Sequence, residues 1–324
     1  MSLRSSIARL PGARRVWQQA NALLQRMSAL RTRVRPESVA AEDSPPNLRV
    51  RLDLWMLALA NRVSFRSVTN GTSDTVVTMT THGSRIATVY LALESIARGT
   101  RRPARLILWL DDPDLMRTLP PELRRLQRRG LEVILAPAGY KVHTKYHFYV
   151  TSIDRHSRSL VTSDDDIVYP RTWLAGLEEA HARHPELVVC YRAHTITPAD
   201  GALAPYSSWT PCASTRPSFR TFGTSVSGQL FPASFLDYVR DAGEAFLELA
   251  PNADDVWLHC LTVRAGIRVA QIDETPVLFP FVPTSQATGL YLTNYWDGGN
   301  DRQITATYSS SEIARISHDG DSAP

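Results

Sequence analysis

The residues LVTSDDDIVYP, at positions 160 to 170, decide how we interpret this chain. A short apolar run rich in β-branched residues ends in three consecutive carboxylates, Asp164, Asp165 and Asp166. Three like charges are costly to hold near a sheet edge unless a cation neutralises them. Mg²⁺ and Mn²⁺ suit this role because they take carboxylate oxygens and keep positions open for phosphates. Side chains alternate in an extended segment, so we expect Asp164 and Asp166 to hold a metal and Asp165 to face a sugar or ribose. A solvated turn after a strand is the alternative that these three residues leave open.

Composition indicates a globular protein with one large domain, since 43% of the 324 residues are hydrophobic. Only two lysines, Lys141 and Lys145, stand among 36 basic residues. This arginine bias lacks any nucleic-acid motif, so we expect no nucleic-acid partner. The three cysteines, Cys190, Cys212 and Cys260, have no metal-site spacing and fit a reducing compartment. Neither a signal-peptide core nor an apolar run long enough to span a bilayer is present in the sequence, so we expect a cytoplasmic protein.

The N-terminal residues 1–35 contain eight arginines and no acid. Their apolar residues from Val16 to Val34 recur at steps of three and four, which predicts an amphipathic helix. A cationic helix of this kind can lie on an anionic membrane surface, here the inner face of the plasma membrane. An oligomerising helix, a helix packed on the fold and a frayed tail are the alternatives. A Pro-rich linker follows, so we divide the chain into an extension (1–47), a catalytic domain (48–310) and a polar tail (311–324).

The catalytic domain is predicted to alternate strands with helices. The expected strands cover 74–81, 104–112, 131–138, 160 onward and 187–196, and the helices between them cover 86–96, 121–129, 144–153 and 171–183. Such alternation is typical of an α/β protein with a Rossmann-like, mostly parallel central sheet flanked by helices. Ligands bind at the carboxyl ends of such strands, where the three aspartates lie, and where Asp111 and Asp112 end the second strand.

The alternation ends beyond Thr197. Residues 198–220 are rich in Pro, Ser and aromatic side chains and predict a long surface loop, suited to cover an acceptor. The glycines of 221–232 suit close approach of the backbone to a ligand. A helix is expected over 234–249, and another after Asn252 as N-cap, with Asp254 and Asp255 in its first turn. Complementing the helix dipole is the alternative role of these two acids.

Together, these segments resemble a bacterial glycosyltransferase with the GT-A fold, of the family-2-like kind that acts on cell-surface glycans. The resemblance spans 74–308 and rests on TMTTHGSRI, LILWLDD, SDDDIVYP, ADDVWLHCLTVRAG and SQATGLYLTNYWDGGNDRQI, in this order. In the family the first segment cradles the nucleotide, the second approaches its base and ribose, and the third binds metal and diphosphate. The fourth supplies the general base, and the fifth closes the domain. The chain departs from the family in GTSVSG, which has fewer glycines, and in DD where ED is commoner.

The resemblance implies a role for each candidate residue. Asp164 and Asp166 would bind a divalent metal, and Asp255 would be the catalytic base of an inverting displacement, although a retaining mechanism stays open. The residues expected to contact the substrates are Thr81, Arg85, Asp111, Asp112, Lys145, Asp164, Asp165 and Asp254. For Lys145 an exposed helix cation, and for Arg85 a solvated surface arginine, are the alternatives.

The sequence thus predicts a metal-dependent hexosyltransferase of cell-envelope polysaccharide biosynthesis. It would move one sugar from a nucleotide-sugar donor, which the resemblance implies is a UDP-sugar, to a hydroxyl of a glycan or glycolipid. A metal bound to the diphosphate would stabilise its rising charge as the glycosidic bond breaks. A sugar-phosphate nucleotidyltransferase is one alternative, although TMTTHGSRI lacks the Gly-rich, basic character typical of its first loop. A non-catalytic binding or scaffolding protein is the other.

Overall fold

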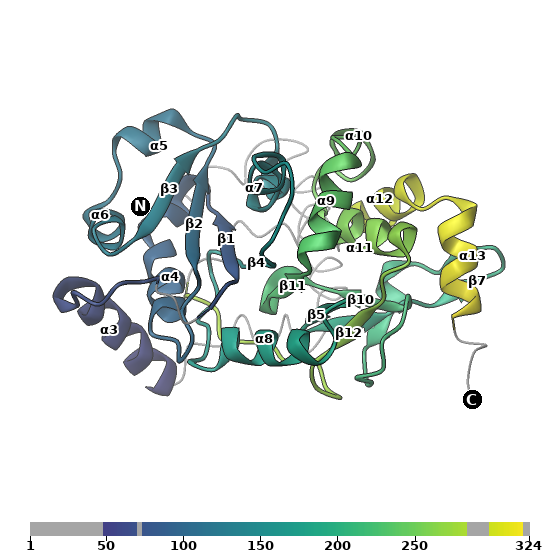
Figure 1. Ribbon diagram of the computed structural model, residues 1–324, viewed down its shortest axis with the longest axis horizontal. Helices are drawn as coiled ribbons and strands as arrows, with labels where there is room; N and C mark the ends of the chain where they lie inside the picture. The colour runs from purple at the N-terminus through teal and green to yellow at the C-terminus, as the bar shows by residue number, and fades with distance from the viewer. Residues whose placement is uncertain (1–47, 70–72, 284–297, 320–324) are drawn as a thin grey trace, which may run out of the picture. The chain divides into compact units, whose positions relative to one another are not determined.

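The computed structural model describes residues 48–69, 73–283 and 298–319 (Figure 1). The predicted amphipathic helix within 1–35 and most of the segment 285–304 lie outside these residues.

A seven-stranded sheet forms the centre of the described domain, with the strand order β12-β5-β11-β4-β1-β2-β3. Only β11 runs antiparallel to its two neighbours, which confirms the predicted mostly parallel α/β sheet. Apolar runs such as LILWL form the parallel strands because both faces of the sheet are covered. The strands are β1 (Val76–Thr80), β2 (Arg105–Leu110), β3 (Leu131–Leu135), β4 (Leu160–Thr162), β5 (Val188–Cys190), β11 (Gln229–Phe231) and β12 (Val269–Gln271).

Two hydrophobic cores lie on opposite faces of this sheet. Alternate residues point to opposite faces, so Val76 belongs to one core and Val77 to the other. One face packs against α4 (Val89–Ala97), α6 (Pro121–Gln127) and α8 (Trp173–Arg183). The other packs against α7 (His147–Thr151), α9 (Ala233–Asp241) and α11 (Asp254–Ala265), as Figure 1 shows. Helices on both faces leave the strand ends as the place for a ligand.

The prediction of one strand over 187–196 is wrong. The chain leaves the main sheet after Cys190, and β6 (Ala193–Thr195) pairs with β10 (Thr221–Gly223) and β9 (Thr210–Pro211) in a separate antiparallel sheet. The backbone N–H of Ala193 donates to the side-chain oxygen of Gln271 at 2.9 Å. This contact ties the start of β6 to β12, which is distant in the sequence. Local sequence carries no signal for that contact.

The segment 198–220, predicted as a long surface loop, is mostly exposed but contains short ordered elements. The segment forms a hairpin of β7 (Pro198–Ala199) and β8 (Ala202–Leu203), a 3-10 turn η5 (Tyr206–Ser208), and β9. Trp209, Cys212 and Phe219 are buried in the core under β6 and β10. The apolar residues among its prolines and serines therefore hold the segment on the fold.

Other elements differ from the prediction in their ends. The helix expected over 234–249 breaks at Gly243, whose φ is +68°, into α9 and α10 (Phe246–Leu249). The helix expected over 144–153 is a 3-10 turn, η4 (Lys141–Lys145), followed by α7. Ala253, not Asn252, is the N-cap of α11, and the Asn252 side chain accepts a hydrogen bond from Lys141 instead.

The remaining elements are η3 (Gly83–Ala87), α5 (Pro113–Arg117), η6 (Ser225–Ser227), α12 (Gly299–Thr307) and α13 (Ser310–His318). The segment expected as a polar tail thus begins within α13, whose Ile316 is buried.

The first described helix, α3 (Leu48–Val63), packs against α4 and α6. Leu57 and Asn61 form its buried side. The Asn61 amide donates to Glu94 at 2.9 Å and accepts from Arg125 at 2.8 Å, so polar contacts fix the rotation of the helix.

Candidate functional site

The carboxyl ends of β1 and β4 bring the first loop to the three aspartates. Thr81 donates from Oγ1 to Asp165 Oδ2 at 2.6 Å, and Arg85 donates from Nη1 to Asp165 Oδ1 at 2.8 Å. The same nitrogen of Arg85 lies 3.2 Å from Asp166 Oδ2. Asp165 is only 5% exposed, and both of its oxygens are bound by this loop. The predicted contact of Asp165 with a sugar stays a prediction.

The expected alternation of the three aspartates is wrong. β4 ends at Thr162, and residues 165–166 form a turn, so Arg85 reaches both Asp165 and Asp166. Backbone contacts hold this turn in place. The N–H of Asp164 donates to the Tyr169 hydroxyl at 2.8 Å, and the Asp166 carbonyl accepts from the N–H of Val282 at 2.6 Å.

Lys145 joins the aspartate segment to the start of α11. Its Nζ lies 2.5 Å from Asp164 Oδ1 and 3.3 Å from Asp254 Oδ2, and its side chain is 8% exposed. Burial opposes the charge, but Asp164, Asp254 and Asp255 together raise the pKa of Lys145 well above its ordinary value. Lys145 is therefore a buried cation between two acidic elements that lie far apart in the sequence, and not an exposed helix cation.

Asp255 is held by the segment that the sequence analysis singled out for its glycines. Its Oδ1 accepts from the Ser225 N–H at 3.0 Å, from the Ser225 hydroxyl at 2.6 Å and from Gln229 Nε2 at 3.1 Å. Burial and the charge on Asp254 raise the pKa of Asp255 to about 7, although Lys145 and the Ser225 hydrogen bond lower it. A carboxylate with this pKa can accept a proton near neutral pH. Sequence reasoning missed both Ser225 and Gln229, because only their tertiary contact with α11 reveals their role.

The glycine between these residues allows the turn. Gly228 has a φ of +98°, and a Cβ there would lie 2.7 Å from the indole nitrogen of Trp173. That nitrogen donates to the carbonyl of Ser227 at 2.8 Å. The turn is therefore packed tightly on α8, and this packing positions Ser225 and Gln229 for Asp255.

The carboxylates of Asp164 and Asp166 fit a divalent metal in their chemistry. Burial, together with the charges on Asp165 and Asp164, raises the pKa of Asp166 to about 7. A bound dication would relieve this crowding of negative charge. Within 48–69, 73–283 and 298–319, no group of three or more His, Cys, Asp or Glu side chains is arranged to hold a metal. Phosphate oxygens and water would therefore complete a coordination shell, as is usual for Mg²⁺.

Asp111 and Asp112, the acids that follow β2, lie at the same edge of the sheet as the first loop. Asp112 caps α5, since its Oδ1 accepts from the N–H groups of Asp114 and Leu115 at 2.8 and 3.4 Å. Asp111 is half-buried at the same edge of the sheet as Thr81. Their predicted contacts with a base and ribose stay predictions.

None of the described helices is long and apolar enough to cross a membrane. This finding applies to residues 48–69, 73–283 and 298–319.

Comparison with known proteins finds glycosyltransferases among the solved structures similar to this chain. No protein-family model and no curated protein matches it. The mannosyltransferase PcManGT of Pyrobaculum calidifontis, in complex with GDP-Man and Mn²⁺, is 13% identical, with a TM-score of 0.47 over 79% of this chain and 69% of that one. TarS 1-349 of S. aureus is 10% identical, with a TM-score of 0.44 over 75% of this chain and 68% of that one. The 4-diphosphocytidyl-2C-methyl-D-erythritol synthase of Anaerococcus prevotii is 12% identical, with a TM-score of 0.43 over 71% of this chain and 100% of that one.

Proposed function

We propose that this chain is a metal-dependent glycosyltransferase that moves one sugar from a nucleotide-sugar donor to an acceptor hydroxyl. The observation that carries the proposal is the pair of contacts from Lys145 to Asp164 and Asp254. These contacts bring Asp164, a candidate metal ligand, close to Asp254, the residue before the candidate base. A glycosyl transfer from a diphosphate needs both groups at one site, because charge rises on the leaving group while the acceptor loses a proton.

In the proposed reaction, Asp164 and Asp166 hold the divalent metal, Mn²⁺ or Mg²⁺. When bound, the metal neutralises charge that develops on the departing diphosphate. Arg85 binds Asp165 and Asp166, and Lys145 binds Asp164, so these cations position the carboxylates that would hold the metal. Thr81 and Arg85 also bind Asp165, which ties the first loop to the aspartate segment.

Asp255 is the proposed general base of an inverting displacement. Ser225 and Gln229 both bind its Oδ1, so we assign proton acceptance from the acceptor hydroxyl to Oδ2. Asp254, next to it, is bound to Lys145 and keeps the pKa of Asp255 raised. We propose a UDP-sugar as donor and a cell-envelope glycan or glycolipid as acceptor, following the family resemblance.

The decisive experiment measures nucleoside diphosphate release by the purified full chain from a panel of nucleotide sugars, with Mn²⁺ or Mg²⁺. We expect Asp255→Asn to keep metal-dependent nucleotide binding, measured by calorimetry, and to lose at least about 100-fold in transfer rate. Asp241→Asn, on the exposed end of α9, is the matched control and should leave both unchanged. An active Asp255→Asn enzyme would remove this residue from the base role. Pyrophosphate release from a nucleoside triphosphate and a sugar phosphate would favour the nucleotidyltransferase, and binding without release would favour a scaffold.

The pH profile tests the same assignment. Transfer at saturating metal should rise as pH increases through about 7, because Asp255 must be ionised to accept a proton. Ser225→Ala removes a hydrogen bond that lowers the pKa of Asp255. The rising limb of the variant should therefore move to higher pH, and an unmoved limb would assign the titration to another group.

A further inference from the structure

The outer face of α3 is a continuous stripe of exposed apolar side chains. Its six large residues recur at steps of four, three, one, three and four along the helix. Their exposed fractions are 72% for Leu48, 54% for Leu52, 63% for Trp55, 57% for Met56, 41% for Leu59 and 59% for Val63. Phe65, just after the helix, is 97% exposed. An exposed apolar patch of this kind marks an interaction surface.

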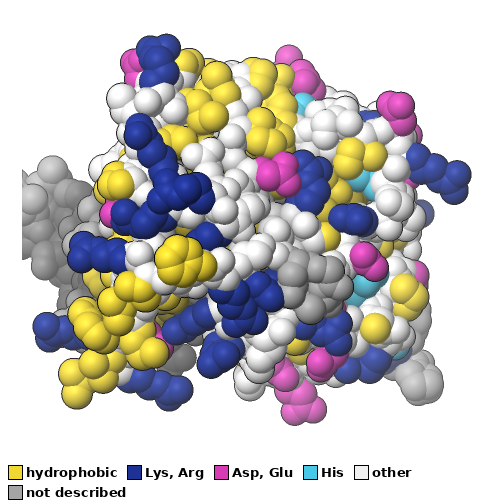
Figure 2. Space-filling view, turned by 60° about the vertical axis from the view of Figure 1, so that its left-hand side comes forward, with side chains coloured by type: hydrophobic (Ala, Val, Ile, Leu, Met, Phe, Trp, Pro, Cys, Tyr) yellow, Lys and Arg dark blue, Asp and Glu magenta, His cyan; other side chains and the backbone are white. Residues whose placement is uncertain are grey.

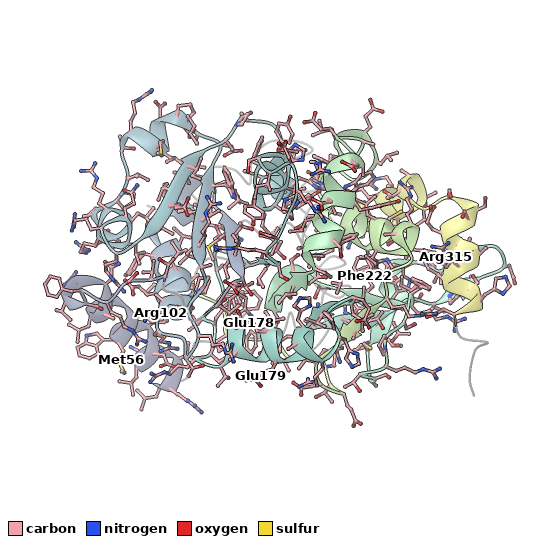
Figure 3. The ribbon with its side chains drawn as sticks, in the orientation of Figure 1. Met56, Arg102, Glu178, Glu179, Phe222 and Arg315 are labelled. Carbon is pink, nitrogen blue, oxygen red and sulfur yellow. The ribbon has the colours of Figure 1, made fainter. Side chains whose placement is uncertain are left out.

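The helix cannot turn this stripe inward. Its opposite side already packs on the domain through Leu57, and Asn61 is hydrogen-bonded to Glu94 and Arg125. Asp53 is paired with Arg98 at 3.0 Å and adds a further link to α4. Figure 3 shows Met56 on the outer side of α3, away from the sheet.

Arginines border the stripe. At about 100° per residue, Arg49 falls beside one edge of the stripe, and Arg51 and Arg62 fall beside the other. All three are exposed, as is Arg66 just beyond the helix. The sole acid within 48–66 is Asp53, which is the residue paired with Arg98. Figure 2 shows hydrophobic side chains gathered next to Lys and Arg on this side of the molecule.

We propose that the outer face of α3, residues 48–66, docks on an anionic lipid bilayer. Leu52, Trp55 and Leu59 would enter the boundary between headgroups and acyl chains, and the bordering arginines would contact lipid phosphates. This proposal does not depend on the transferase activity.

The charge of the arginines favours a lipid bilayer over two other occupants of the stripe, the N-terminal residues 1–35 and a second copy of α3. Residues 1–35 carry eight arginines and no acid, so they share the sign of the arginines bordering α3. A second copy of α3 packed on the stripe would bring Arg49, Arg51 and Arg62 against the same residues of its partner. Both arrangements oppose like charges, whereas an anionic surface is complementary to them.

The test is flotation of the full chain with vesicles of phosphatidylcholine, alone or mixed with phosphatidylglycerol. The variant L52S/W55S/L59S removes the centre of the stripe. L135S/L247S, which replaces two exposed leucines elsewhere, is the matched control. Wild type and control should float only with the anionic vesicles, and the α3 variant should lose at least about tenfold in partition coefficient.

Two more variants make the result decisive. R51E/R62E keeps the apolar stripe and should also lose binding, with a smaller loss at high salt. R4Q/R9Q/R14Q/R15Q tests the N-terminal segment and should retain binding that depends on α3. Undiminished flotation of L52S/W55S/L59S would overturn the proposal. So would light scattering that shows a dimer of the wild type which this variant abolishes, because α3 would then be a contact between copies.

Discussion

Asp166→Asn should stabilise the metal-free protein although it removes a residue of the proposed metal site. Burial, with the charges on Asp165 and Asp164, raises the pKa of Asp166 from 3.8 to about 7. The folded protein therefore keeps a proton on this carboxyl at pH values where the unfolded chain has released it. Ionisation in the folded state has a free-energy cost that an amide of the same shape avoids.

The size of this cost follows from the pKa. A shift from 3.8 to about 7 is roughly three units, and at ~1.4 kcal/mol per unit it gives an upper limit of about 4 kcal/mol. The sign depends on pH. Below about pH 4 the carboxyl is protonated in both states and the variant gains nothing, and the gain grows up to about pH 7 and then stays constant. We therefore expect Asp166→Asn to raise the free energy of unfolding by about 2–4 kcal/mol at about pH 8 and by almost nothing at about pH 4.

Urea unfolding in a metal chelator at these two pH values measures the difference, with Asp241→Asn as the control for removing an exposed carboxylate. Adding Mn²⁺ and a nucleoside diphosphate should then stabilise wild type and leave Asp166→Asn unchanged. A variant that is no more stable than wild type at about pH 8 would refute the view that the buried charge of Asp166 destabilises the folded protein.

Two further substitutions test the packing and charge of the site. Lys145→Met leaves the buried carboxylate of Asp254 and the half-buried one of Asp164 without their cation, so we expect a loss of about 3–5 kcal/mol in urea unfolding at neutral pH, and unchanged stability would contradict the bridge. Gly228→Ala and Gly139→Ala both place a side chain at a φ near +100°, but only at Gly228 does the new Cβ meet Trp173. Thermal unfolding should therefore show a loss about 1–3 kcal/mol greater for Gly228→Ala, and equal losses would mean that this turn is not tightly packed.

The sequence predicts the parallel half of the sheet well because burial on both faces forces a local signal. LILWL of β2, after Arg105, is a continuous apolar run, which is typical of a strand buried on both faces of a sheet. The antiparallel half is harder to predict. Val188–Cys190 and Ala193–Thr195 read as one run, yet a contact with Gln271 redirects the chain between them. Short strands that are fixed by distant side chains leave no period in the local sequence.

The candidate site shows the same limit. The acids could be found because three aspartates in a row, and two at a helix start, are unusual in sequence. The residues that bind these acids could not be found from the sequence. Lys145 lies on a 3-10 turn, and only the fold shows that it reaches both acidic segments. The outer stripe of α3 is the reverse case, because its large apolar residues face outward although such residues are usually buried.

The charge balance of the site argues for the order in which its ligands bind. The contacts above gather five carboxylates, Asp164, Asp165, Asp166, Asp254 and Asp255, around two cations, Arg85 and Lys145. With every group ionised this cluster has a net charge of −3, and a nucleoside diphosphate is itself an anion. Like charges repel strongly in a site with little water, so the nucleotide should not bind alone. We expect calorimetry to detect no nucleoside diphosphate binding in a chelator, and binding once Mn²⁺ is added, with proton release near neutral pH as Asp166 ionises. Tight nucleotide binding without metal would mean that cations other than Arg85 and Lys145 neutralise the site, and Asp164 and Asp166 would then lose their metal role.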